Sequence, residues 1–531
     1  MKKIIYSLPL LLALGACSSE EGLTPEVPST GGEGNYYLTM NLAVPTDMKS
    51  TRSTTENNGS SSDRLLGGTD AENEVTSLDL YIIDSDTKAV LKAYKGVKNN
   101  VDGNTLSTPT DPNENKDATY NVSIQLSTSP TDEVSAFATA VATHNISLIV
   151  VCNPEQFGSP AISNFEEKFN GTITDFGEDG KTMPMASIAH TTPITAFKQK
   201  STVSDVRAMF TADNGNFYYD LTPESGTSNN ANAIDVERAV ARLDLAVADT
   251  YKLMDGVGGP ESGIELSMYS VTPFNVNNKS YVFRHTAAGD DAAANTAAAL
   301  FGNEKGNSGY TWVADPSWTF ETSAFTKDVN TYLTVNKLDY SKKPYGVTSP
   351  IAESEKTITE ITSRTPDETT STTYYPWCYV SENTIPSVSL MESDLEKNAT
   401  GVLFKFQIKN KSKNGVITKT TPDSELPKYV TVEKTGDEIS ALYITLPQSG
   451  KTEKFEPDTD GNIFLTYCGF ITHNQGSNSI AAMNYGVVRN NVYQMKVNKI
   501  ENLPAPDDAK YYLKLDINVL KWNRRTVGFD F

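Results

Sequence analysis

Apolar and polar residues alternate along several short segments of the chain. In residues 36–44 the side chains of Tyr36, Leu38, Met40, Leu42 and Val44 share one face, and Pro45 follows. A period of two residues predicts a half-buried β-strand, which proline then ends. Ile146–Val151 is apolar almost throughout, which predicts a strand buried on both faces. The alternating pattern predicts further strands at Val75–Ile83, Ala239–Val247, Val492–Ile500 and Tyr511–Val519.

Long polar stretches separate these predicted strands, and helical patterns are few and short. Regular short strands with turn-rich connections favour β-sandwich architecture, so we predict a mainly β protein. A chain of 531 residues exceeds the usual size of one hydrophobic core, and we expect two or more domains, with a boundary near residues 248–258. The best candidates for short helices are Asp132–His144, Asn164–Asn170 and Asp290–Phe301.

The first 17 residues have the organisation of a targeting segment. A basic start is followed by the apolar run Ile4–Ala13 and by Leu14-Gly15-Ala16-Cys17. An apolar run of about ten residues is too short to cross a bilayer core of roughly 30 Å as a helix, and the small residues before Cys17 indicate a signal-peptide cleavage site. The pattern resembles a bacterial lipobox, which implies lipidation of Cys17; the alternative is a plain secretory signal with an incidental cysteine.

Composition and motifs give no support for catalysis. The formal net charge of −21 argues against nucleic acid or an anionic membrane as a partner. Cys152, Cys378 and Cys468 lie far apart, so we expect small core residues and neither disulfides nor a zinc site. The four histidines lack metal-ligand or catalytic spacing, and the residues around Asp458 fail the spacing of a calcium loop. We predict no enzyme activity, no metal and no cofactor.

A polar segment, Pro45–Asn73, follows the first predicted strand. Lys49, Arg52 and Arg64 are the only basic residues between positions 4 and 87, and all three lie in it. Such a composition predicts a disordered, protease-accessible segment. Arg52 is the first candidate for a cleavage point and Arg64 the second, while the alternative is an ordinary flexible loop.

The chain ends on strongly alternating residues. Leu503–Ala509, rich in proline and aspartate, is predicted to be a stiff spacer, and a bend is predicted at Lys521–Arg525. The alternative is that the final strand is simply the last strand of its own domain. One face of the predicted strand carries Tyr511, Leu513, Leu515, Ile517 and Val519, and Trp522 follows.

Several short motifs occur in an order that resembles the Bacteroidales fimbrillins, most closely the shaft subunits of minor (Mfa-type) fimbriae. They are Leu14–Cys17, a strand followed by Arg52, the strand Val75–Ile83, Ile149–Pro154, Val236–Arg242, Arg489–Tyr493 and the final Trp522 with Phe529–Phe531. The resemblance covers nearly the whole chain. It implies two tandem transthyretin-like β-sandwich domains with a few short helices.

The resemblance also implies a route of assembly. A lipidated precursor reaches the outer membrane, an Arg-specific protease cuts after the first strand, and the C-terminal strand of the next subunit fills the vacated groove. The implied division is a signal peptide at 1–17, a propeptide at 18–52, sandwich domains at 53–248 and 249–502, and spacer with donor strands at 503–531. The displaced strand carries Tyr36, Leu38, Met40, Leu42 and Val44, and the donor strand carries Tyr511, Leu513, Leu515, Ile517, Val519 and Trp522.

The implied function is a structural subunit of surface fimbriae that supports adhesion. The implied partners are identical subunits, anchor and tip subunits, the Arg-specific protease, and host or bacterial surface receptors. The precursor is expected at the outer membrane and the mature protein in the cell-surface fimbrium. The alternative is a fimbrial tip adhesin or a glycan-binding surface lipoprotein.

Overall fold

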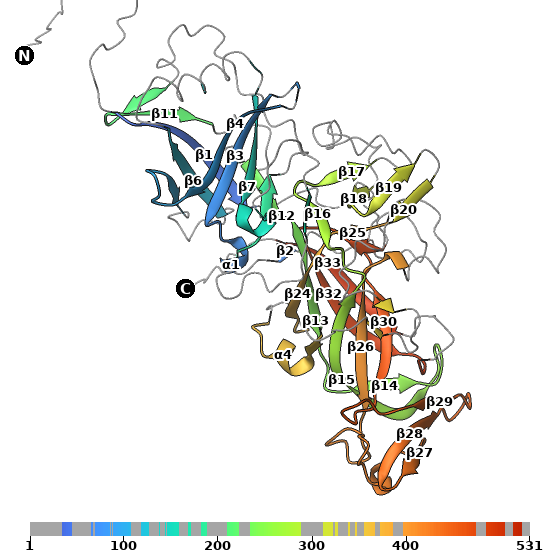
Figure 1. The fold of residues 1–531 in the computed structure, drawn as a ribbon. Coiled ribbons are helices and arrows are strands. Elements are labelled where there is room, and N and C mark those ends of the chain that lie inside the picture. The colour runs from blue at the N-terminus through green and yellow to red at the C-terminus, as the bar shows by residue number, and fades with distance from the viewer. Residues whose placement is uncertain are drawn as a thin grey trace, which may run out of the picture.

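The computed structural model is built mainly from β-strands, in two large sheets and several small ones (Figure 1). Among the described residues no helix is long and apolar enough to cross a membrane. The sheets of the described residues confirm the predicted mainly β fold class. The described residues are 34–44, 65–66, 70–84, 86–87, 89–107, 118–126, 137, 144, 146–158, 168–170, 182–187, 210–221, 234–287, 312–321, 324–327, 338–339, 346–347, 355–366, 372–385, 397–473, 485–504 and 513–522.

The first sheet has ten strands in the order β10-β11-β1-β12-β9-β7-β3-β4, with β6 paired to β1 and β5 paired to β6. The first predicted strand is found with the bounds expected from its alternation. The strands are β1 (Tyr36–Val44), β3 (Ser77–Asp84), β4 (Val90–Lys98), β5 (Thr105–Ser107), β6 (Ala118–Gln125), β7 (Ile146–Cys152), β9 (Met185–Ser187), β10 (Thr211–Asp213), β11 (Asn216–Asp220) and β12 (Ile234–Arg238).

The second sheet has ten strands in the order β2-β33-β32-β14-β15-β26-β30, with β13, β23 and β24 paired off this path. It extends through the lower half of Figure 1, with β30 at the edge opposite β2. The strands are β2 (Leu65–Leu66), β13 (Val240–Ala246), β14 (Tyr251–Met254), β15 (Glu261–Phe274), β23 (Lys356–Thr357), β24 (Tyr375–Ser381), β26 (Gly401–Ile408), β30 (Leu465–Phe470), β32 (Asn491–Ile500) and β33 (Leu513–Trp522).

Small sheets and short helical turns make up the other described elements. The three-stranded sheet consists of β27 (Val430–Thr435), β28 (Glu438–Thr445) and β29 (Thr452–Phe455). The paired strands are β8 (Lys168–Asn170) with β16 (Lys279–Tyr281), β17 (His285–Ala287) with β18 (Trp312–Ala314), β19 (Trp318–Glu321) with β20 (Ala324–Lys327), β21 (Leu338–Asp339) with β22 (Gly346–Val347), and β25 (Asn383–Thr384) with β31 (Gly486–Val487). The helical elements are α1 (Asp70–Asn73), η1 (Pro154–Phe157), α4 (Ile358–Thr362) and η7 (Asp423–Glu425).

The strand β7 is buried on both faces, as its sequence predicts. All seven of its residues are buried. Leu148 and Val150 pack in the core of the first sheet, whereas Ile149 and Val151 pack with a second group that includes Phe283. A segment from the middle of the chain therefore covers the outer face of β7, which explains why charged residues are missing from it.

The helix predicted at Asn164–Asn170 is wrong at its end, because residues 168–170 form β8 and pair with β16. That pairing joins residues more than a hundred positions apart, and such partners override local helical preference. Most of Asp132–His144 and all of Asp290–Phe301 lie outside the described residues.

The division into domains stays a prediction, but the hydrophobic cores can be located. One core is built mainly from β1, β3, β6 and β7, and the other mainly from β13, β15, β26 and β32. The strand predicted at Ala239–Val247 is β13, which pairs with β24 and with β32 of the second sheet.

The cysteine predictions hold for two of three positions. Cys152 and Cys378 are buried free thiols, and burial raises the pKa of Cys152. Cys468 is only half-buried, because it lies on the face of β30 opposite to the buried side chains of Leu465 and Tyr467.

Candidate functional site: the first strand, the last strand and the junction

The first strand β1 lies inside the first sheet, with a neighbour on each side. Residues 37–44 pair antiparallel with β6 over the whole of that strand. On its other side, residues 36–39 pair in parallel with β11 and residues 42–43 with β12. Removal of β1 would therefore expose hydrogen-bonding groups of three other strands along one continuous groove.

The inward face of β1 is a large part of the first core. Tyr36, Leu38, Met40 and Leu42 are at most 4% exposed. The Tyr36 ring stacks on Phe217 at a centroid distance of 4.7 Å and meets Phe210 edge-on at 5.2 Å. Full burial of such side chains contributes about 1.5–3 kcal/mol each, so these four contribute roughly 6–12 kcal/mol before entropic costs. The side chain of Val44 lies outside the described set.

The last strand β33 pairs along its length with β32 in antiparallel fashion. Ile517 is 4% exposed and Leu515 packs against the same second core, next to Gly469 of β30. The strand runs through Trp522, so the bend predicted to begin at Lys521 is wrong for Lys521 and Trp522. Leu503 is fully buried in the second core, so the predicted spacer is anchored there at its start.

The short strand β2 forms the outer neighbour of β33. Leu65 and Leu66 pair in parallel with Lys521 and Trp522 (Figure 1). The chain segment that follows the predicted cleavage region therefore lies against the end of the last strand. Cys17, Arg52, Arg64 and Tyr511 lie outside the described residues.

A buried polar cluster follows β2 and connects the two sheets. Glu72 of α1 accepts hydrogen bonds from Arg242 of β13 at 3.1 Å and from the Tyr379 hydroxyl of β24 at 2.5 Å. Arg242 also donates to Asp244 at 2.9 and 3.0 Å. Burial, together with the charge of Glu72, raises the pKa of Tyr379, which remains a neutral donor.

Arg238, at the end of β12, extends this cluster toward the first sheet. Its guanidinium donates to the Glu72 carbonyl at 3.1 Å and to the side chain of Asn73. Burial lowers the pKa of Arg238 to about 10, and Glu72 opposes this shift. The residue is therefore charged at neutral pH.

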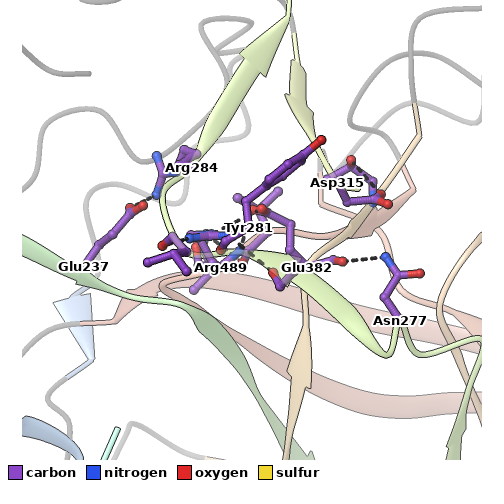
Figure 2. Close-up of polar contacts among 12 residues, drawn as sticks. Glu237, Asn277, Tyr281, Arg284, Asp315, Glu382 and Arg489 are labelled. Atoms are coloured by element: carbon purple, nitrogen blue, oxygen red, sulfur yellow. Dashed lines mark hydrogen bonds and ion pairs between the residues drawn. The ribbon is translucent and has the colours of Figure 1, made fainter. Parts of the chain in front are cut away.

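Figure 2 shows a second buried polar cluster, and we call the two clusters together the junction. Arg489 donates to Glu382 at 3.2 Å and to the carbonyl groups of Tyr281 and Val282 at 2.7 and 3.0 Å. Glu237 of β12 pairs with Arg284. Burial raises the pKa of Glu237, and Arg284 opposes the shift.

The residues of these two clusters contribute to the stability of the fold. Their carboxylates are hydrogen-bonded to arginines at nearly zero exposure, and loss of one partner of such a buried pair costs about 3–5 kcal/mol. No group of His, Cys, Asp and Glu suited to a metal ion occurs among the residues that the structure describes. The carboxyl group of Asp458 accepts the N–H groups of Asp460 and Asn462, which is a turn and agrees with the rejection of a calcium loop.

Sequence reasoning found the arginines of this junction only as parts of short motifs. Arg238 and Arg242 stand among apolar residues of Val236–Arg242, and Arg489 begins the motif that ends at Tyr493. A basic residue within an otherwise buried strand is the signal that could have identified them, since buried charges require partners. Nothing local marks Glu72, whose partners lie 170 and 307 positions away.

The geometry defines a β-sheet protein whose first and last strands both lie in large sheets. Residues 461–527 match the family described as "Major fimbrial subunit protein type IV, Fimbrillin, C-terminal". The matched region contains β30, β32 and β33. The predicted resemblance to the fimbrillins is therefore confirmed, and the family match itself covers these C-terminal residues.

Solved structures with similar chains come from Parabacteroides distasonis and Porphyromonas gingivalis. A candidate cell adhesion protein of Parabacteroides distasonis is 12% identical, with 92% of this chain and 100% of that chain covered and a TM-score of 0.42. The C-terminally truncated tip fimbrial protein Mfa3 of Porphyromonas gingivalis is 11% identical (92% and 100% covered, TM-score 0.32). A fimbrilin (fimA) of Porphyromonas gingivalis is 10% identical (93% and 99%, TM-score 0.33). No curated protein matches the chain.

Proposed function

We propose that the chain is a shaft subunit of surface fimbriae, exported as a lipoprotein precursor and polymerised by donor-strand exchange. The observation that carries this proposal is the position of β1. It is a central strand with four buried side chains, yet it is joined to the following elements only through the segment that carries Arg52 and Arg64.

The need for a cut follows from effective concentration. While β1 is covalently attached, it competes for its groove at high local concentration, and an incoming strand cannot displace it. Cleavage after Arg52, or after Arg64, turns β1 into a dissociable peptide. The groove between β6 and the β11–β12 side is then available to the C-terminal strand of another subunit, a form of β-augmentation.

The same proposal gives the lipid a transient role. If Arg52 is cut, the lipid on Cys17 leaves together with β1. The lipid then delivers the precursor to the outer membrane and is absent from the finished polymer. Anchor and tip subunits would occupy the two ends, and surface receptors would be bound by the assembled fimbria.

To test the proposed polymerisation, the unlipidated precursor is treated with an Arg-specific protease, and the product is analysed by gel electrophoresis. A ladder that resists heat and detergent is expected. Cleavage without a ladder would contradict polymerisation.

A chain ending at Lys510 provides the control, because it can accept a strand and has none to donate. In excess over the full chain it should shorten the ladder, which also reports that it folds. A ladder from the truncated chain alone would refute the donor assignment. A tip adhesin is distinguished by the same assay, since it accepts a strand without forming a ladder on its own.

A further inference from the structure

The first and last strands have closely similar sequences. Residues 36–44 read Tyr-Tyr-Leu-Thr-Met-Asn-Leu-Ala-Val, and residues 511–519 read Tyr-Tyr-Leu-Lys-Leu-Asp-Ile-Asn-Val. Four of the nine positions are identical, and three more exchange Met for Leu, Asn for Asp and Leu for Ile. The four positions whose side chains are buried in β1 are apolar or aromatic in both segments.

We propose that residues 511–519 of a second copy enter the groove of β1 in the same direction and the same register, so that each residue replaces its counterpart between Tyr36 and Val44. This inference rests on the proposed function and fixes the geometry of its interface. The incoming strand would run antiparallel to β6 and parallel to β11 and β12, as β1 does.

The aromatic end of the groove selects this register. Tyr36 stacks on Phe217 and meets Phe210 edge-on, while Tyr37 stacks on Tyr218 at 5.3 Å. Offset-stacked and edge-on aromatic pairs are favourable beyond the burial of their surface area. In the proposed register Tyr511 and Tyr512 supply both rings again.

Other alignments lose these matches. A shift by two residues in one direction places Leu513 in the position of Tyr36 and Lys521 in that of Val44. A shift in the other direction places Ala509 in the position of Tyr36. Reversal of the strand places Val519 among the aromatic rings. A shift by one residue would turn the charged face inward.

The backbone register is also defined at β11, where Thr39 pairs with Asp220, so Lys514 would take the backbone position opposite Asp220. The backbone also fits without change, because the carbonyl groups of Tyr36 and Thr39 accept the N–H groups of Leu126 and Leu221, both at 2.7 Å.

Paired cysteines on the outward face test both register and direction. Thr39 and Asn41 of β1 lie opposite Ser123 and Asn121 of β6. The proposed register therefore places Lys514 opposite Ser123, and Asp516 opposite Asn121. A reversed strand centred on Leu515 would exchange these partners.

Four double variants of the full unlipidated chain distinguish the two arrangements. Each carries Cys468→Ser, which removes the half-buried thiol. After protease treatment and mild oxidation, the ladders are denatured without reductant. Under conditions that dissociate the non-covalent ladder, S123C/K514C and N121C/D516C are expected to retain covalent ladders, whereas N121C/K514C and S123C/D516C are expected to dissociate to monomers.

The outcomes separate the register from the proposed function. Preferential linkage of the second pair of variants would overturn the proposed direction while leaving strand exchange intact. A non-covalent ladder with no linkage in any variant would overturn the register. Absence of any ladder in the parent chain would overturn both.

Discussion

Truncation of Leu42 to alanine should destabilise the precursor and leave the polymer unaffected. Leu42 is fully buried in β1 and packs in the first core. Leucine-to-alanine changes at such sites cost about 2–5 kcal/mol, through lost transfer energy and the remaining cavity. The free energy of unfolding of the precursor should fall by that amount in a denaturant titration.

The polymer should respond differently, because its subunits no longer contain β1. After cleavage and assembly, Leu42→Ala and the parent chain should give ladders with the same resistance to heat and detergent. Leu80→Ala provides the matched control, since Leu80 is equally buried in β3, which stays in the subunit. It should weaken precursor and polymer alike. An equal loss of polymer stability in Leu42→Ala would refute the replacement of β1.

Three further predictions concern other parts of the chain. In Gly469→Ala the added Cβ would overlap the Leu515 side chain, so β33 should leave its own sheet more easily and ladders should form faster; slower assembly would contradict this. Tyr379→Phe removes the hydrogen bond to Glu72 and should lower the free energy of unfolding by about 1.5–3 kcal/mol, measured by denaturant titration. The N–H group of Thr87 lowers the pKa of Asp84 below 3.8, so Asp84 contributes stability that is full above that value and lost as the pH falls through the lowered pKa; Asp84→Asn should remove this part of the acid dependence.

The sequence predicts most accurately those strands whose pattern of apolar and polar residues follows from their packing within one sheet. The period of two in residues 36–44 gives β1 with its bounds, because one face packs in the core and the other is more accessible. The apolar run of β7 likewise identifies a strand covered on both faces.

Features set by distant partners could not be predicted in this way. Residues 168–170 form a strand only because residues 279–281 lie beside them. The strand β13 joins the second sheet because β24 and β32 flank it. Glu72 lies in a polar stretch of the sequence. Its burial is explained only by its hydrogen bonds with Arg242 and Tyr379, which are distant in the sequence.

The position of β33 qualifies the prediction of a donor strand. Its apolar face was expected from alternation, and Leu515 and Ile517 do pack against the second core of the same chain. The strand is therefore held by β32 and β2 before it could serve another subunit. To enter another subunit, β33 must therefore give up its contacts with β32 and β2 and form new contacts in the groove that β1 vacates.

The most direct measurement is the mass of the subunits in the assembled polymer. Native mass spectrometry of ladders formed after Arg-specific cleavage reports whether residues 36–44 are still bound, covalently or as a peptide. We expect subunits that begin at Ser53, or at Leu65 if Arg64 is cut, with the peptide that contains β1 released into solution. Polymers whose subunits retain residues 36–44 would contradict the replacement of the first strand by the last.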